Sequence, residues 1–220
     1  MTPDEIKKLL QGAPAGFAYT LLLTAAATGA RHNELLALGW RDVDFEGGTV
    51  HVRRTLSWVA TDEGSAPRYF PPKTKAGRRK IPAPPPLLQA LRRWFLQSHY
   101  KAECDLIFPN AAGAPRDHRA VNRRVYRLRT RIGLRTFTMY SLRHTFASSL
   151  LQGGASIAEV QKYMGHKTPA VTLNTYTQFL PTEDSGAVAA HVARLFPYGH
   201  FLDTLAASGS DQPDSAAVSA

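Results

Sequence analysis

The stretch between residues 140 and 176 carries helix-ending signals at such short intervals that it can form only short helices. A first helix must stop at the Gly153-Gly154 pair, because glycine readily adopts the left-handed conformation that ends helices. A serine–glutamate capping box starts a second helix that ends at Gly165, and the Thr168-Pro169 step starts a third. The spacing therefore predicts three consecutive helices whose polar side chains lie close together.

Three side chains that can act on a phosphate group lie on this segment. Arg143 falls near the start of the first helix, His166 follows the turn after the second, and Tyr176 lies on the third. A helix N-terminus and a guanidinium together favour phosphate binding. Arg143 lies off the apolar stripe of its helix, which consists of Leu142, Phe146 and Leu150.

The N-terminal part of the chain reads as a succession of helices. A capping box predicts a helix over residues 2–10, and apolar periodicity predicts further helices over 15–28 and 33–38. Arg31 then lies at the corner between two helices, although it could also simply cap the helix before it. Glu34 falls in the first turn of the next helix, where we expect it to orient its neighbours.

The hydrophobic period changes from helical to alternating between residues 43 and 82. Val50 and Val52 alternate with polar residues after a Gly47-Gly48 turn, and residues 79–82 form another extended piece. We expect one small antiparallel sheet here and helices in the rest of the chain. The first of these follows a proline-rich bend and buries a face made of Leu87, Leu88, Leu91, Trp94 and Phe95.

Composition narrows the class of partner. The 220-residue chain has a formal net charge of +10 and a pI near 10.0, which favours a polyanion such as nucleic acid, although a basic surface without a partner is the alternative. It shows no signal peptide and no run of about 18 apolar residues, which predicts a cytoplasmic, nucleoid-associated protein. The single Cys104 excludes an internal disulfide and lacks a zinc-binding partner, so we expect no metal and no other cofactor.

A basic segment supports the hypothesis that the partner is a nucleic acid. Arg119, Arg123 and Arg127 recur every four residues and would line one face of a helix. Such a face could follow a DNA backbone, giving affinity that depends strongly on salt. The alternative is a solvated helix face without a partner.

Three motifs in one order resemble the tyrosine recombinase (phage integrase) family: TGARHNELLAL, then LRHTFA, then MGHKTPAVTLNTY. The likeness covers residues 2–179 and rests on the combination, since each motif alone has low specificity. It implies a mainly α-helical fold with a small antiparallel sheet, the catalytic-domain fold of that family. The implied activity is site-specific recombination of double-stranded DNA through a 3′-phosphotyrosine intermediate, without a cofactor.

The resemblance also implies roles for individual residues. Arg31 and Arg143 are similar to the two arginines that clamp the scissile phosphate, and His166 to the histidine that donates a hydrogen bond to it. Tyr176 is similar to the nucleophile, and Lys73 to a lysine that gives a proton to the departing 5′-oxygen. These roles suit the chemistry, because fixed guanidinium groups complement the charge that develops on the phosphate oxygens.

Two positions of the predicted site have alternative interpretations. The family usually has histidine where this chain has Tyr140, and a phenol with a pKa of about 10 is a poor base at neutral pH. We expect Tyr140 to donate a hydrogen bond to the phosphate or to orient Tyr176, with simple packing as the alternative. Lys75 is the alternative to Lys73, and His144 is expected to pack beside Arg143.

The predicted organisation is a catalytic domain over residues 1–182, a C-terminal helical segment over 183–202 that contacts another subunit or its own domain, and a disordered tail over 203–220. We expect the N-terminal DNA-clamping domain of the family to be absent. The family resemblance implies a homotetramer on DNA, and a monomer in isolation remains open. A type IB topoisomerase-like enzyme and a catalytically silent DNA-binding protein are the alternatives.

Overall fold

The computed structural model describes residues 1–134 and 137–177, which lie in a compact unit spanning Met1–Leu180. The predicted segments 183–202 and 203–220 fall outside the described residues. No helix within the described ranges is both long and apolar enough to cross a bilayer.

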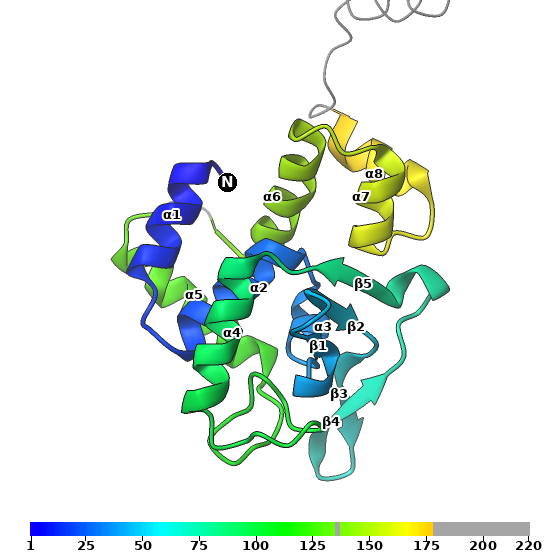
Figure 1. Cartoon of the computed structure of the whole chain (residues 1–220). Helices are drawn as coiled ribbons and strands as arrows, with labels where there is room; N and C mark the ends of the chain where they lie inside the picture. The colour runs from blue at the N-terminus through cyan, green and yellow to red at the C-terminus, as the bar shows by residue number, and fades with distance from the viewer. Residues whose placement is uncertain (135–136, 178–220) are drawn as a thin grey trace, which may run out of the picture. The chain divides into compact units, whose positions relative to one another are not determined.

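Three helices open the chain, as predicted: α1 (Pro3–Gly12), α2 (Phe17–Thr28) and α3 (His32–Leu35) (Figure 1). The capping box at the start of α1 is present, and α2 ends at a glycine with a φ of 58°. The prediction that the third helix reaches residue 38 was wrong. Beyond α3 the backbone hydrogen bonds join residues three positions apart, so the chain forms tighter turns than an α-helix. It then enters an isolated antiparallel β-bridge between Gly39 and Leu106.

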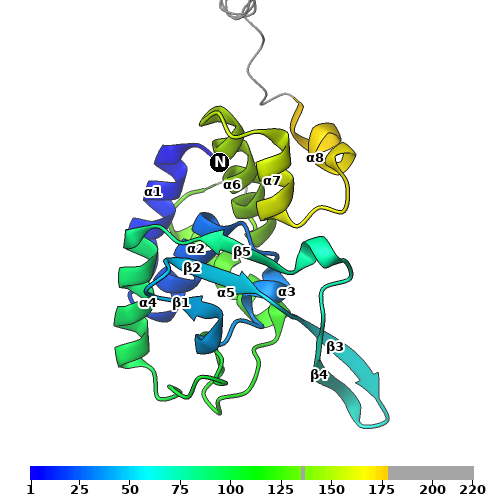
Figure 2. The same ribbon diagram turned by 45° about the vertical axis from the view of Figure 1, so that its right-hand side comes forward.

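The alternating region forms two sheets, which corrects the expectation of one. Strands β1 (Val43–Asp44), β2 (Thr49–Val52) and β5 (Arg79–Pro82) form an antiparallel sheet in the order β1-β2-β5. Within the described residues, strands β3 (Thr55–Thr61) and β4 (Gly64–Phe70) pair with each other as a separate two-stranded sheet. Both edges of β2 are occupied by β1 and β5, so β3 does not pair with the strand that precedes it, and the β3–β4 hairpin projects from the body of the unit in Figure 2.

Helix α4 (Pro85–Gln97) follows the proline-rich bend as predicted, and α5 (His118–Arg131) carries the basic segment. The expectation that the rest of the chain after the sheet is helical was wrong for residues 98–117, which form turns and irregular loops. Two indole N–H groups anchor these loops, since Trp40 donates to the carbonyl of Tyr100 and Trp94 donates to the carbonyl of Ile107. Short helical turns also occur at η1 (Trp40–Asp42) and η2 (Lys75–Gly77).

The three short helices predicted near the C-terminal end are α6 (Met139–Gln152), α7 (Ile157–Met164) and α8 (Pro169–Tyr176). Their boundaries include the predicted stop of α6 at Gly153, the Ser156 capping box and the left-handed Gly165 of α7 with a φ of 64°, and the Thr168-Pro169 start of α8. Helix α7 contacts α6, α8 and strand β5 (Figure 1). A small core of their own holds these helices together, formed by Ala147, Leu151, Val160, Met164 and Tyr176.

The main core surrounds α2, which packs against α1, α3, α4 and α6. Leu21, Leu22 and Ala25 on α2 are almost fully buried. Fully burying a leucine side chain contributes about 1.5–3 kcal/mol, so this helix is a major source of stability. The residues that follow α2, at the corner before α3, are therefore held by a rigid support.

Candidate active site

Three successive carbonyl groups at the end of α7, in residues 163–165, each accept a hydrogen bond from a different arginine; we call this group the carbonyl end of α7. The donors, in that order, are Nε of Arg79 at 2.6 Å, Nη2 of Arg143 at 2.5 Å and Nη2 of Arg31 at 3.3 Å. The last carbonyl groups of a helix lack partners within it and carry partial negative charge, so they attract cations. They collect three guanidinium groups from distant parts of the sequence.

Arg31 presents the most accessible of these guanidinium groups. Arg31 directly follows the corner after α2 and is the N-cap residue of α3. Nη1 of Arg31 lies 2.8 Å from Oε1 of Glu34, and 44% of the arginine side chain is exposed. This ion pair fits the prediction that Glu34 orients its neighbours. Arg31 thus keeps solvent-facing N–H groups while its position is fixed.

Arg143 is buried, with 3% of its surface exposed. Its Nη1 donates to the carbonyl of Gly29 at 2.6 Å, which links α6 to the end of α2. Burial, and secondarily Arg31, lowers the pKa of Arg143 to about 10, so it still carries a charge at neutral pH. The prediction that Arg143 lies off the apolar stripe of α6 was partly wrong. Arg143 faces inward, whereas the stripe residues Phe146 and Leu150 are only half-buried. Its bonds to two carbonyl groups compensate for this burial.

Arg79 is a site residue that the sequence reading missed. Its Nη2 lies 2.8 Å from Oε2 of Glu34 and its Nη1 lies 3.2 Å from Oε1, so the two groups form a forked ion pair. Both side chains are buried, and the two arginines that flank Glu34 keep the pKa of its carboxyl low despite the opposing effect of burial. Alternation along β5 could have revealed Arg79, because it points to the same buried face as Ile81.

His166 follows the carbonyl end of α7 and is buried. Its Nδ1 lies 2.8 Å from the hydroxyl of Thr172, a buried residue of α8. Burial, followed by the nearby Arg143 and Arg31, lowers the pKa of His166 to about 4. Its imidazole is therefore neutral at physiological pH in the absence of an anion.

Tyr176 lies at the end of α8 with 2% of its surface exposed. Its ring stacks on the ring of His166, with centroids 6.5 Å apart and planes 10° apart. Burial raises the pKa of Tyr176 to about 12, although Arg143 acts in the opposite direction. The phenol is therefore protonated at neutral pH, and removing its proton requires help from the site or the substrate.

His144 and Tyr140 extend this arrangement of rings. The ring of His144 lies 5.4 Å from that of Tyr176 and 4.4 Å from that of Tyr140, measured between centroids. His144 thus contacts both tyrosines, which adds to the expected packing beside Arg143. Tyr140 is 63% exposed and lines a cavity of about 410 Å³ together with Arg31 and Arg143.

Lys73 and Lys75 lie close to the sheet but outside the arginine group. Lys73 is exposed in the loop between β4 and η2, and Lys75 is exposed in η2 itself. Within the described residues no hydrogen bond or ion pair joins either lysine to Arg31, Arg143 or His166. The choice between the two lysines stays open.

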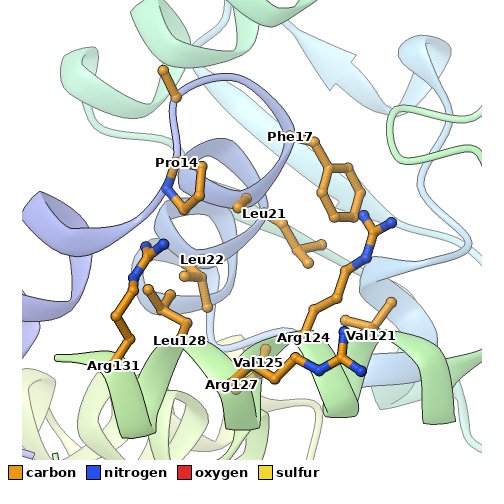
Figure 3. Close-up of a pocket in the computed structure, with 12 residues that line it drawn as sticks. Pro14, Phe17, Leu21, Leu22, Val121, Arg124, Val125, Arg127, Leu128 and Arg131 are labelled. Carbon is orange, nitrogen blue, oxygen red and sulfur yellow. The ribbon is translucent and has the colours of Figure 1, made fainter. Parts of the chain in front are cut away.

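The predicted basic face is exposed on α5. Arg119, Arg123 and Arg127 are exposed, while the opposite face of the helix packs Val121, Val125 and Leu128 into the core. A groove of about 390 Å³ between α2 and α5 is lined by Arg124, Arg127 and Arg131 and by apolar residues that include Leu21, Leu22 and Val125. Figure 3 shows these side chains.

Comparison with known proteins places this fold and site in one family. The Phage integrase family matches residues 1–183, and the chain belongs to that family. The chain is 28% identical over 201 residues to the tyrosine recombinase XerC-like protein of Caldanaerobacter subterraneus subsp. tengcongensis, covering 84% of this chain and 51% of the relative. It is 30% identical to the prophage integrase IntR of Escherichia coli K12, covering 88% of this chain and 52% of the relative. The chain therefore spans about half the length of these curated relatives.

Solved structures confirm the predicted fold class. The Tn1549 transposon integrase in complex with a circular intermediate DNA superposes with a TM-score of 0.72 at 25% identity, covering 89% of this chain and 65% of the other. XerA recombinase has the same fold, with a TM-score of 0.64 at 23% identity and coverages of 88% and 62%. The mainly α-helical fold with small antiparallel sheets is thus that of tyrosine recombinase catalytic domains.

Proposed function

We propose that the chain is the catalytic part of a site-specific DNA recombinase that cleaves and rejoins DNA through a 3′-phosphotyrosine intermediate. The observation that supports this most directly is the convergence of Arg31, Arg143 and His166 around the carbonyl end of α7, next to the buried ring of Tyr176. Two guanidinium groups and one imidazole N–H match the non-bridging oxygens of a phosphodiester.

Cleavage would begin when the phenol oxygen of Tyr176 attacks the scissile phosphorus. As a bond forms between that oxygen and phosphorus, the phenol proton passes to solvent. The bond from phosphorus to the 5′-oxygen breaks, and Lys73 gives the departing oxygen its proton and is reprotonated from solvent. Arg31, Arg143 and His166 stabilise the charge on the non-bridging oxygens. The phosphotyrosine ester retains the energy of the broken bond, so rejoining by the reverse reaction requires no nucleotide.

The free site holds Tyr176 as a phenol and His166 as a neutral imidazole. A bound phosphate would raise the pKa of His166, because an adjacent negative charge favours the imidazolium. Tyr140 would donate a hydrogen bond to the phosphate or orient Tyr176, since it lines the cavity that also contains Arg31 and Arg143. The chemistry is thus expected to start only after DNA has bound.

Double-stranded DNA is the proposed substrate, and the exposed arginines of α5 are the proposed backbone contacts. The solved Tn1549 integrase and XerH recombinase are complexes with DNA. Assembly into a homotetramer on DNA, and location at the nucleoid, extend the proposal by likeness to the family. The family resemblance supports a recombinase over a type IB topoisomerase-like enzyme, because the relatives reported above are named recombinases and integrases.

The decisive experiment is covalent capture from a library of nicked DNA duplexes with a randomised segment next to the nick. The nick lets the short 5′-hydroxyl product diffuse away, so a cleaved duplex stays attached to the protein and can be recovered in detergent and sequenced. We expect adducts with the 220-residue chain and none with Tyr176→Phe. The matched control is Tyr126→Phe, which removes a phenol from a residue that is 58% exposed on α5.

Two results would contradict the proposal. Adducts that persist in Tyr176→Phe would show another nucleophile. DNA binding without adducts in the unaltered chain would support the catalytically silent DNA-binding protein.

A further inference from the structure

Arg79 uses nearly all of its hydrogen-bonding capacity inside the protein. Nε donates to the carbonyl of Tyr163 at 2.6 Å, Nη1 donates to the carbonyl of Gly77 at 3.0 Å and to Glu34 at 3.2 Å, and Nη2 donates to Glu34 at 2.8 Å. A guanidinium has five N–H groups, so at most one remains. Arg143 is as buried as Arg79 but donates only two such bonds within the described residues, so the number of committed N–H groups is what separates Arg79 from the phosphate clamp.

The partners of Arg79 belong to three separate parts of the candidate active site. The carboxylate of Glu34 accepts hydrogen bonds from the backbone N–H and from Nη1 of Arg31, both at 2.8 Å. The carbonyl of Tyr163 begins the carbonyl end of α7, which also receives Arg143 and leads into His166. The carbonyl of Gly77 belongs to η2, which closes the loop that carries Lys73. One buried side chain therefore connects the phosphate clamp with the lysine loop.

The charges in this cluster explain why the residue is an arginine. Glu34 is buried and carries one negative charge, and it contacts both Arg31 and Arg79. If Arg79 were neutral, Arg31 would be the remaining ion-pair partner of Glu34 within the described residues, with Arg143 as a further positive charge nearby. Glu34 would then offset more of the positive charge that Arg31 presents to a phosphate, because its carboxylate lies 2.8 Å from that guanidinium. Arg79 balances Glu34 and leaves the charge of Arg31 available.

The structure assigns to Arg79 the role of a positioning residue that sets both the geometry and the effective charge of the Arg31 clamp. This inference rests on the proposed function and adds to it a residue that does not touch the DNA. The glycine at position 165 fits this role of Arg79. A Cβ atom there would lie 3.0 Å from Nη1 of Arg79, so a larger residue would crowd the arginine side chain.

The test compares single-turnover cleavage rates on a nicked duplex recovered in the capture experiment. Arg79→Met is expected to cleave about 100-fold more slowly, by analogy with the loss of one oriented donor. The matched control, Arg41→Met, changes an exposed arginine on η1 and should leave the rate within about twofold, as surface changes normally do. Thermal unfolding of each variant shows whether it is folded.

A second variant separates charge from packing. Arg79→Met combined with Glu34→Gln removes both opposite charges, so Arg31 is no longer neutralised and we expect the rate to recover by about tenfold over Arg79→Met alone. A purely structural role predicts that any recovery follows recovered stability, because Glu34→Gln also removes a buried unpaired charge. The rates are therefore compared at a temperature where thermal unfolding shows both variants to be fully folded. Failure of the double variant to exceed the single variant would overturn the inference.

The remaining outcomes are also decisive. If Arg79→Met does not fold, Arg79→Lys replaces it, since lysine keeps the charge but lacks the fork that reaches three partners. A folded Arg79→Lys or Arg79→Met variant that cleaves as fast as the unaltered chain would overturn the inference and leave the proposed function intact. Absence of cleavage by the unaltered chain would overturn both.

Discussion

The hydroxyl of Thr172 lies 2.8 Å from Nδ1 of His166, and both residues are buried. When the hydroxyl donates this hydrogen bond, the single proton of the neutral imidazole must be on Nε2. That nitrogen can then donate to a phosphate oxygen. Thr172, on the first half of α8, therefore connects the helix of the proposed nucleophile with the protonation of the histidine.

Replacing Thr172 with valine should lower the single-turnover cleavage rate by about tenfold, because a histidine without its orienting partner samples the wrong tautomer. Valine has nearly the same shape, so the fold should persist. Thr175→Val is the matched control, because the hydroxyl of Thr175 is exposed and, among the described residues, donates to the carbonyl of Val171 within its own helix. Equal rates for the two variants would exclude a role for Thr172 in orienting His166.

Tyr140→Phe tests the departure of this chain from the family pattern. The substitution keeps the ring that contacts His144 and removes a hydroxyl from a residue that is 63% exposed, so stability should stay within about 0.5 kcal/mol. We expect cleavage to slow by about tenfold, as for a lost hydrogen bond to a charged group. Cleavage at the original rate would leave Tyr140 with a packing role only. Tyr140→His, which introduces the usual family residue, should retain activity.

The free protein should lose stability as the pH falls from about 6.5 to 4. The folded state holds the pKa of both His32 and His166 at about 4, whereas an unfolded histidine takes up its proton near 6.5. Between these values the unfolded state binds more protons, so acid favours unfolding. Urea unfolding at pH 7.5 and pH 5 measures the loss. His166→Asn should lose less stability than the unaltered chain, and the exposed His99→Asn should lose as much.

Substitution of Arg119, Arg123 and Arg127 by glutamine should weaken DNA binding and reduce its dependence on salt. Each lost phosphate contact lowers the slope of log affinity against log salt by about 0.9, so three contacts predict a decrease of about 2.7. Fluorescence anisotropy over a salt series measures the slope. The control makes the same change of charge elsewhere on the exposed surface, at Lys7, Arg41 and Arg93. Equal slopes for the two triple variants would place the DNA on another face.

Much of the local structure could be predicted because its causes are local. The capping box at Thr2, the left-handed Gly29 and Gly165, and the prolines that start α4 and α8 act within a few residues of their own position. Alternation likewise predicted β2 and β5, although it could not show that β3 and β4 form a second sheet. Pairing partners depend on which strand edges remain unoccupied, and this is a property of the whole fold.

The sequence by itself determined most of the helix boundaries around the site, the end of α3 excepted, and its motifs identified Arg31, Arg143, His166 and Tyr176 as the residues to examine. Only the tertiary structure decided that Arg143 is buried, that Arg79 pairs with Glu34, and that three arginines meet at the carbonyl end of α7. The physical reason is that the contact between β5 and α3 joins residues 45 positions apart. Such contacts depend on packing around the core, which no local pattern records.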